Sequence, residues 1–264
     1  MEILAVAIEM ARSAGELLRG RLGAVDSVEF KGAVDIVTEM DRQSEALIVG
    51  AIKGRFPEHG ILAEEGGEVV STSPYRWIID PLDGTTNYAH GFPVYCVSIG
   101  IEHNGAMAAG VVYAPAMDEL FTAELGKGAY LNGTRLSVSK TGRLDTSLLA
   151  TGFPYDIRTS KETNLDHFGN FAVRSQAIRR PGAAAYDLCT VAAGRFDGFW
   201  EMKLRPWDVA AGMLIVTEAG GVVTDFDNAQ VSMERGEVLA TNGLIHAEML
   251  AVLNMSRPQA TTKP

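Results

Sequence analysis

The chain has 264 residues, of which 47% are hydrophobic and 21% are charged, a composition typical of a globular protein with a substantial buried core. Its net charge of −10 argues against binding to other negatively charged surfaces, so we expect neither nucleic acid nor a membrane as a partner. No apolar run approaches the roughly 20 residues of a membrane span, and acidic residues interrupt the N-terminal segment, so we expect a cytoplasmic protein without a signal peptide.

The first half of the chain predicts two helices followed by closely spaced strands. Residues 3–21 and 41–56 carry apolar side chains at helical spacing. Strand patterns separated by short turns follow at 75–80, 95–102, 105–115, 118–124 and 128–133. Because these strands succeed one another without intervening helices, we expect an antiparallel sheet.

The second half alternates strands with helices. Strand patterns occupy 147–153, 195–202, 221–226 and 237–242, and helical patterns occupy 162–173, 183–194, 206–221 and 243–253. The change of pattern near residue 143 divides the chain into two expected parts, 1–143 and 144–264. No flexible linker separates them, so we expect the two parts to pack tightly.

Acidic residues gather where expected strands end or helices begin. The four stretches contain Asp35 and Asp41, Glu64 and Glu65, Asp80 and Asp83, and Asp208. Taken singly, each stretch has an ordinary explanation as a helix cap, a solvated loop or a turn. Because all four stretches lie at the ends of expected strands or helices, the alternative is that their carboxylates form one common binding site.

The stretch "WIIDPLDGTTNYAHG", residues 77–91, favours such a site. Asp80 directly follows an apolar strand, and a simple turn has no use for the second carboxylate of Asp83. Closely spaced oxygen ligands are what Mg²⁺ prefers, with water and a substrate phosphate completing its octahedron. The sequence therefore indicates a magnesium and phosphate site at this strand end.

Two long motifs resemble the signatures of the inositol monophosphatase family. They are "WIIDPLDGTTNYAHGFP" and "PWDVAAGMLIVTEAGG", and "DIVTEMD", "AEEG", "GAYLNG" and "GAAAYDL" fall between or around them in the family's order. The likeness runs from about residue 3 to 254. It implies an α+β fold, the layered αβαβα sandwich also found in fructose-1,6-bisphosphatase, together with a lithium-sensitive homodimer.

The resemblance also implies a role for each site residue. Two to three Mg²⁺ ions would be held by Glu64, Asp80, the Leu82 carbonyl, Asp83 and Asp208, with Glu65 near a weaker third site. Asp41, Glu64 and Thr85 would be catalytic, with Asp41 and Thr85 orienting the attacking water. Substrate would contact Asp83, Gly84, Thr85, Arg179, Ala184, Glu201 and Asp208. Ala183 stands where many relatives carry serine or threonine, which leaves selectivity among polyols open.

The expected activity is Mg²⁺-dependent hydrolysis of myo-inositol 1-phosphate by an activated water. Within the same family, the substrate could instead be fructose 1,6-bisphosphate or another sugar phosphate, histidinol phosphate, or adenosine 3′,5′-bisphosphate. The haloacid dehalogenase-like phosphatases fit less well, because one residue separates their aspartates whereas Pro81 and Leu82 separate these. A regulatory partner protein with little or no phosphatase role is the alternative from a different class.

Overall fold

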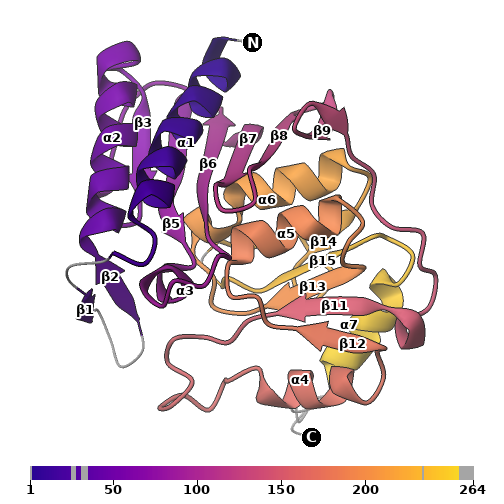
Figure 1. Cartoon of the computed structure of the whole chain (residues 1–264). Helices are drawn as coiled ribbons and strands as arrows, with labels where there is room; N and C mark the ends of the chain where they lie inside the picture. Colours follow the sequence, from indigo (N-terminus) through magenta and orange to yellow (C-terminus); the bar gives the residue numbers. More distant parts are fainter. Residues whose placement is uncertain (1, 25–27, 31–34, 234, 256–264) are drawn as a thin grey trace, which may run out of the picture.

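A computed structural model of the protein describes residues 2–24, 28–30, 35–233 and 235–255. Its helices and two large sheets stack in layers, and the two sheets are formed by successive parts of the chain (Figure 1). The connection between them runs from the strand β10 (Thr134–Arg135) to the short 3₁₀ helix η1 (Leu144–Thr146).

The first part of the chain builds an eight-stranded sheet. Its helices are α1 (Glu2–Arg21), α2 (Glu39–Arg55) and α3 (Thr85–Ala89). A small pair, β1 (Val28–Phe30) and β2 (Ile36–Thr38), precedes the large sheet of β3 (Gly60–Ala63), β4 (Gly67–Val69), β5 (Tyr75–Asp83), β6 (Cys96–His103), β7 (Ala106–Ala114), β8 (Glu119–Glu124), β9 (Gly128–Leu131) and β10 (Thr134–Arg135). The strand order is β10-β9-β8-β7-β6-β5-β3-β4, and all neighbours are antiparallel except β3 and β5. The antiparallel prediction, made for the strands β5 to β9, is therefore confirmed, and the parallel pair involves β3, which was not predicted.

The second part builds a five-stranded mixed sheet. Its strands are β11 (Leu148–Thr151), β12 (Ala177–Arg179), β13 (Gly198–Glu201), β14 (Val222–Thr224) and β15 (Val238–Thr241). Its helices are α4 (Leu165–Ala172), α5 (Ala184–Ala192), α6 (Pro206–Glu218) and α7 (His246–Met255). In the order β12-β11-β13-β15-β14, the strand β11 is parallel to both neighbours, and the remaining pairs are antiparallel.

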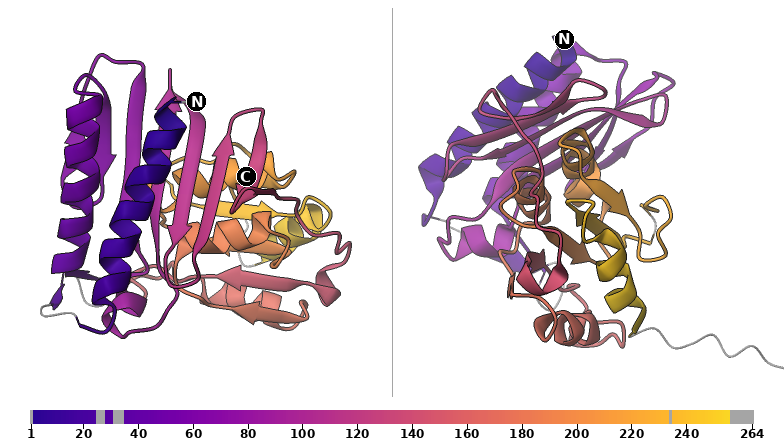
Figure 2. Two further views of the ribbon diagram at one scale, coloured as in Figure 1. Left: turned by 45° about the horizontal axis from the view of Figure 1, so that its top comes forward. Right: turned by 90° about the vertical axis from the view of Figure 1, so that its right-hand side faces the viewer.

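Three hydrophobic cores hold the layers together. One lies between α1, α2 and the eight-stranded sheet, and includes Trp77 and Tyr113. A second surrounds α5 and α6 between the two sheets. The third lies under α4 and α7 on the far face of the five-stranded sheet and includes Trp200. The resulting order of helices, sheet, helices, sheet and helices confirms the predicted αβαβα sandwich (Figure 2).

Small residues bring α6 unusually close to the eight-stranded sheet. A Cβ atom on Gly110 of β7 would lie 2.9 Å from the Ala211 carbonyl oxygen, and one on Gly100 of β6 would lie 2.9 Å from the Ala210 Cβ. The backbone of α6 can touch the sheet only because these glycine positions carry no side chain. The close packing places the start of α6, with Asp208, beside the end of β5.

Across the described ranges, no helix is both long enough and apolar enough to cross a bilayer.

Candidate active site

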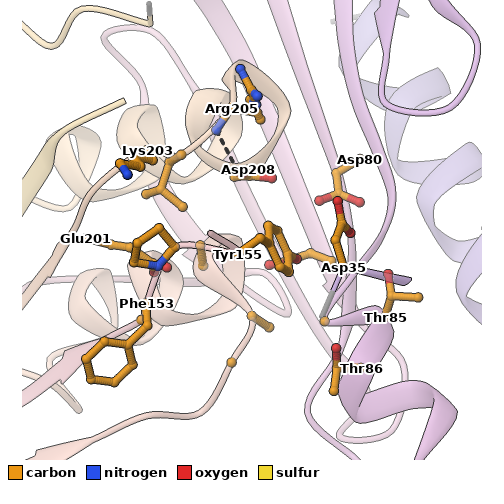
Figure 3. A pocket seen from close by; sticks show the side chains of 18 of the residues that line it. Asp35, Asp80, Thr85, Thr86, Phe153, Tyr155, Glu201, Lys203, Arg205 and Asp208 are labelled. Carbon is orange, nitrogen blue, oxygen red and sulfur yellow. Dashed lines mark hydrogen bonds between the residues drawn. The ribbon is translucent and has the colours of Figure 1, made fainter. Parts of the chain in front are cut away.

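A cavity of about 480 Å³ opens where the two sheets meet (Figure 3). Its walls come from the ends of β5 and β13, from α3, from the starts of α5 and α6, and from the segment after β11. The predicted residues that line it are Glu64, Asp80, Leu82, Asp83, Gly84, Thr85, Ala184, Glu201 and Asp208. Residues more than 100 positions apart in the chain thus meet at one site.

An irregularity in β5 turns both of its aspartates toward the cavity. Residues three apart in a regular strand point to opposite faces, but the pairing of β5 with β6 shifts register between Asp80 and Asp83. The Leu82 N–H donates to Asp80 Oδ1 over 2.9 Å and fixes this turn. Gly84 follows with φ 87°, a left-handed conformation that suits glycine, and starts α3.

Asp83 reaches across from the eight-stranded sheet to the start of α5. Its Oδ2 accepts a hydrogen bond of 2.7 Å from the Ala185 N–H and lies 3.5 Å from the Cys96 Sγ. Burial raises the pKa of Asp83 to about 6, while the N–H groups of α5 act in the opposite direction. One oxygen of this carboxylate is therefore held in place, and the other is left for the cavity.

The other acidic groups crowd the same wall. Burial and the neighbouring carboxylates of Glu64 and Asp83 raise the pKa of Asp80 well above its usual value. Burial likewise raises the pKa of Asp208, whose Oδ2 accepts the Arg205 N–H over 2.7 Å at the start of α6. A divalent cation among these carboxylates would offset the repulsion between them.

The candidate ligand atoms are of the chemical type that Mg²⁺ prefers. Every candidate ligand is a carboxylate or carbonyl oxygen, which is the donor set of a hard divalent cation. In the described part of the chain, no three acidic, histidine or cysteine side chains already converge on one ligating point. The Leu82 carbonyl oxygen, which the resemblance implies as a ligand, lies 3.0 Å from Thr85 Oγ1 and shares the single hydroxyl proton of Thr85 with Asp41.

Asp41 and Thr85 form a directed hydrogen-bond pair beside the carboxylates. Thr85 Oγ1 donates to Asp41 Oδ1 over 2.9 Å, and the Thr38 N–H and Oγ1 hold Asp41 Oδ2 over 2.8 and 2.7 Å. Asp41 caps α2 through the Thr38 contacts and is buried. Burial raises the pKa of Asp41, partly offset by these hydrogen bonds. The carboxylate is thus fixed at the start of its own helix and presents one oxygen to Thr85.

Glu65 and Arg179, both predicted for the site, lie outside the cavity wall. The backbone N–H of Glu65 donates to Glu45 Oε2 of α2 over 2.9 Å. Arg179 is exposed at the end of β12, whereas its neighbour Arg180 lines the cavity. Arg180 is the residue directly after the end of β12, so the two arginines differ by one position at that end. The arginine that lines the cavity is therefore Arg180 and not the predicted Arg179.

The cavity also has members that the sequence interpretation missed. Arg180, Lys203 and Arg205 place cationic side chains on its wall, and Tyr155 projects into its middle in Figure 3. Lys203 Nζ pairs with Asp156 over 2.8 Å. Tyr155 and Lys203 follow the parallel strands β11 and β13, whose carboxyl ends share one edge. That edge is a common position for ligand sites, and this rule could have found them.

Asp187 of α5 is a buried acid outside the cavity lining. It is 1% exposed, and its Oδ1 has no hydrogen-bond partner among the described residues. Burial, followed by the charges of Glu201 and Asp83, raises the pKa of Asp187 well above its usual value. The folded state therefore resists ionisation of this group, whereas the unfolded chain ionises it freely.

This difference predicts a pH-dependent effect of Asp187→Asn on stability. An acid whose pKa is raised by folding favours the folded state below its unfolded pKa of about 3.9, and this advantage is lost as pH rises toward the folded value. Asparagine does not titrate, so the variant should gain free energy of unfolding relative to wild type as pH rises from about 4 to about 8. Urea unfolding across this range measures the gain. The exposed Asp166 in the first turn of α4 supplies the matched control, Asp166→Asn. A stability difference for Asp187→Asn that stays constant with pH would contradict the assignment.

Comparison with known proteins agrees with the fold and the motifs. The model of the inositol monophosphatase family matches residues 1–257. An inositol-1-monophosphatase from Synechocystis sp. is 47% identical over 252 residues, which cover 95% of this chain and 88% of that protein. Nus factor SuhB of Pseudomonas aeruginosa is 44% identical, with 97% of each chain covered. The structure of an inositol monophosphatase from Anabaena (Nostoc) sp. superposes with a TM-score of 0.89 at 43% identity, over 98% of each chain. The chain belongs to the inositol monophosphatase family.

Proposed function

We propose that the protein is a Mg²⁺-dependent phosphomonoesterase that hydrolyses myo-inositol 1-phosphate. The observation that carries the proposal is the convergence of Glu64, Asp80, Asp83 and Asp208 on one cavity, beside the Asp41–Thr85 pair. A phosphate monoester dianion repels a nucleophile, so its hydrolysis needs both positive charge and a positioned water. The acidic wall supplies ligands for the first requirement, and the hydrogen-bonded pair meets the second.

The residues of the chain have separate tasks in this reaction. When bound, Mg²⁺ supplies the charge that offsets the phosphate dianion and acidifies a water molecule. Because the hydroxyl proton of Thr85 is directed at Asp41 Oδ1 and the Leu82 carbonyl oxygen, the lone pairs of Oγ1 can accept a hydrogen bond from a water in the cavity. That contact orients the water for in-line attack, which is mainly a matter of positioning. No covalent nucleophile is required.

A phosphate-release panel tests the substrate. Myo-inositol 1-phosphate, fructose 1,6-bisphosphate, histidinol phosphate and adenosine 3′,5′-bisphosphate are compared with the purified protein and excess Mg²⁺. We expect the highest kcat/KM on the inositol phosphate. The name of the Synechocystis relative supports this choice. A preference for another member of the panel would keep the phosphatase and replace the substrate.

Glu201 is the group proposed to recognise hydroxyls on the leaving group. It ends β13, lines the cavity, and forms no ion pair in the described part of the chain, while its neighbour Lys203 pairs with Asp156 instead. A carboxylate can accept two hydroxyl donors from a vicinal diol, and its charge strengthens both hydrogen bonds. The acidic wall already supplies negative charge for metal binding, so this acid serves recognition.

We expect Glu201→Gln to lose far more kcat/KM on inositol 1-phosphate than on p-nitrophenyl phosphate, which has no hydroxyls on its leaving group. Burial raises the pKa of Glu201 to about 8, and the charge of Arg180 partly offsets this shift. Near pH 7 the wild-type side chain is therefore largely protonated, and the glutamine of the variant resembles it. The loss should therefore be larger at about pH 9, where the wild-type side chain is ionised. Steady-state kinetics at both pH values measure the effect. Equal losses on the two substrates would remove Glu201 from hydroxyl recognition.

A regulatory role is the second candidate, favoured by the names of several relatives. Proteins called Nus factor SuhB from Pseudomonas aeruginosa and Escherichia coli are each 44% identical to this chain. We propose such a role only beside the phosphatase, because the chemical site is present. Absence of turnover on every panel substrate at saturating Mg²⁺ would make regulation the leading function.

A further inference from the structure

Gly152 lies directly against the carboxylate of Glu201. A Cβ atom at position 152 would fall 2.1 Å from Glu201 Oε1 and 2.3 Å from both Oε2 and Cδ. These distances are far below van der Waals contact, so any side chain at position 152 would compete with the carboxylate for the same space. Glycine at position 152 therefore leaves the space that the Glu201 carboxylate occupies.

The backbone of Gly152 does not itself demand glycine. Its φ lies outside the left-handed range, in contrast to Gly182, which also lines the cavity and has a φ of +90°. An alanine at position 152 is thus compatible with the local backbone. The three atoms nearest to its Cβ would all belong to the end of one flexible side chain, that of Glu201. This makes the contact between Gly152 and Glu201 separable from folding.

Asn164 fixes the segment that carries Gly152 onto the strand that carries Glu201. Its Nδ2 donates to the Gly152 carbonyl oxygen over 2.6 Å and to Thr151 Oγ1 over 2.9 Å, and its Oδ1 accepts the Trp200 Nε1–H over 2.8 Å. Thr151 Oγ1 in turn donates to the Trp200 carbonyl oxygen over 2.6 Å. Asn164 is 3% exposed, so these bonds are shielded from water. The end of β11 is thereby tied to β13 at the residue before Glu201.

We propose that Gly152 is a positioning residue which, held by Asn164, sets the orientation of the Glu201 carboxylate and so determines which leaving groups the site accepts. The proposal builds on the proposed phosphatase function and assigns its selectivity to a pair of residues outside the proposed set of metal ligands. Displacing the carboxylate by about 1 Å is enough to spoil two hydroxyl contacts, an error that can cost up to about 100-fold in rate.

The test compares Gly152→Ala with Gly142→Ala. Gly142 also lies outside the left-handed range, and its hypothetical Cβ would meet nothing within 4 Å, so it reports the general effect of adding a methyl group. For Gly152→Ala we expect kcat/KM on inositol 1-phosphate to fall by about 10- to 100-fold, with p-nitrophenyl phosphate changed less than about 3-fold. Gly142→Ala should match wild type on both substrates.

Three further variants separate positioning from general damage. Asn164 has φ 67°, so Asn164→Gly removes the side-chain hydrogen bonds without straining the backbone, and it should show a smaller selective loss in the same direction. Glu201→Asp shortens the acid by one methylene, so it should cost less in the Gly152→Ala background than in wild type. A strictly additive double variant, Gly152→Ala with Glu201→Asp, would overturn the proposal.

A crystal structure of the Gly152→Ala variant tests the proposal independently of any substrate. We expect the Glu201 carboxylate to be displaced from the alanine Cβ while the β11 and β13 backbones stay in place. An unmoved carboxylate would refute positioning even if activity falls. If wild type hydrolyses p-nitrophenyl phosphate but no polyol phosphate, the proposed substrate fails, and this structure still decides the role of Gly152.

Discussion

Asp83→Asn should abolish turnover while leaving the protein folded. An asparagine can keep the hydrogen bond from the Ala185 N–H through its amide oxygen, but it then turns an N–H₂ donor toward the cavity, where a metal needs an acceptor. Losing one metal ligand removes several kcal/mol of transition-state stabilisation, so we expect kcat/KM to fall by at least about 1,000-fold. Phosphate release at saturating Mg²⁺ measures this.

Stability should move in the opposite direction from activity in this variant. Folding raises the pKa of Asp83 to about 6, so above that pH the native state holds a carboxylate that its surroundings disfavour. A neutral amide removes this cost, and the thermal midpoint without Mg²⁺ should hold or rise. The increase in midpoint that Mg²⁺ gives to wild type should be lost.

The matched control is Asp197→Asn, which changes a buried aspartate away from the cavity. Asp197 accepts hydrogen bonds from the Ser139 hydroxyl over 2.6 Å and from the Leu148 N–H over 2.7 Å. Its substitution should lower stability and leave the Mg²⁺ response intact. Turnover of Asp83→Asn near the wild-type level would remove Asp83 from the metal site.

Asp41→Asn should lower kcat by at least about 100-fold with little change in KM. The new asparagine can satisfy Thr38 with its amide oxygen and would then donate an N–H to Thr85 Oγ1. That reverses the direction of the wild-type hydrogen bond and occupies the lone pair that should face the water. Asp41 is not among the expected substrate contacts, so we expect binding to persist. Steady-state kinetics on the preferred panel substrate separate the two parameters.

Substitutions at Thr85 provide the control for this interpretation. Thr85→Ser keeps a hydroxyl and should retain most of kcat, whereas Thr85→Val keeps the shape, loses the hydroxyl and should resemble Asp41→Asn. Combining Thr85→Val with Asp41→Asn should cost little more than either alone, because the two side chains act as one unit. A large rise in KM with kcat preserved would instead make Asp41 a substrate-binding residue.

The long, periodic parts of the fold were predictable from the sequence. Helices α1 and α2 carry a repeated apolar face, and α6 has proline at its start and glycines after its end, so their positions follow from local chemistry. The hairpin of β3 and β4 was not predicted, because three- and four-residue strands around two glutamates and two glycines give no clear alternation. Strand β12 was missed for the same reason, and its end decides whether Arg179 or Arg180 faces the cavity.

Some residues of the candidate site were likewise predictable from sequence motifs, and others were not. The carboxylates at the end of β5 and at the start of α6 lie in long motifs, and the structure brings them together at one cavity. Tyr155 and the Gly152–Glu201 contact could not be read from any motif, because they depend on how two parallel strands end beside each other. Such contacts depend on the packing of elements that are distant in the chain, and a local sequence pattern contains no information about that packing.

The bond from the Ala185 amide to Asp83 has a consequence for the order of folding. It joins the end of the eight-stranded sheet to the first turn of a helix belonging to the other sheet, and Asn87 Nδ2 reinforces this link by donating to the Pro181 carbonyl oxygen over 2.8 Å. Neither partner has its native neighbour until both sheets have assembled. The amide proton of Ala185 should therefore exchange with solvent only through openings that separate the sheets, and every such opening dismantles the acidic wall at the same time. Protein molecules in which the Ala185 amide is protected from exchange are therefore the same molecules in which the acidic wall is complete.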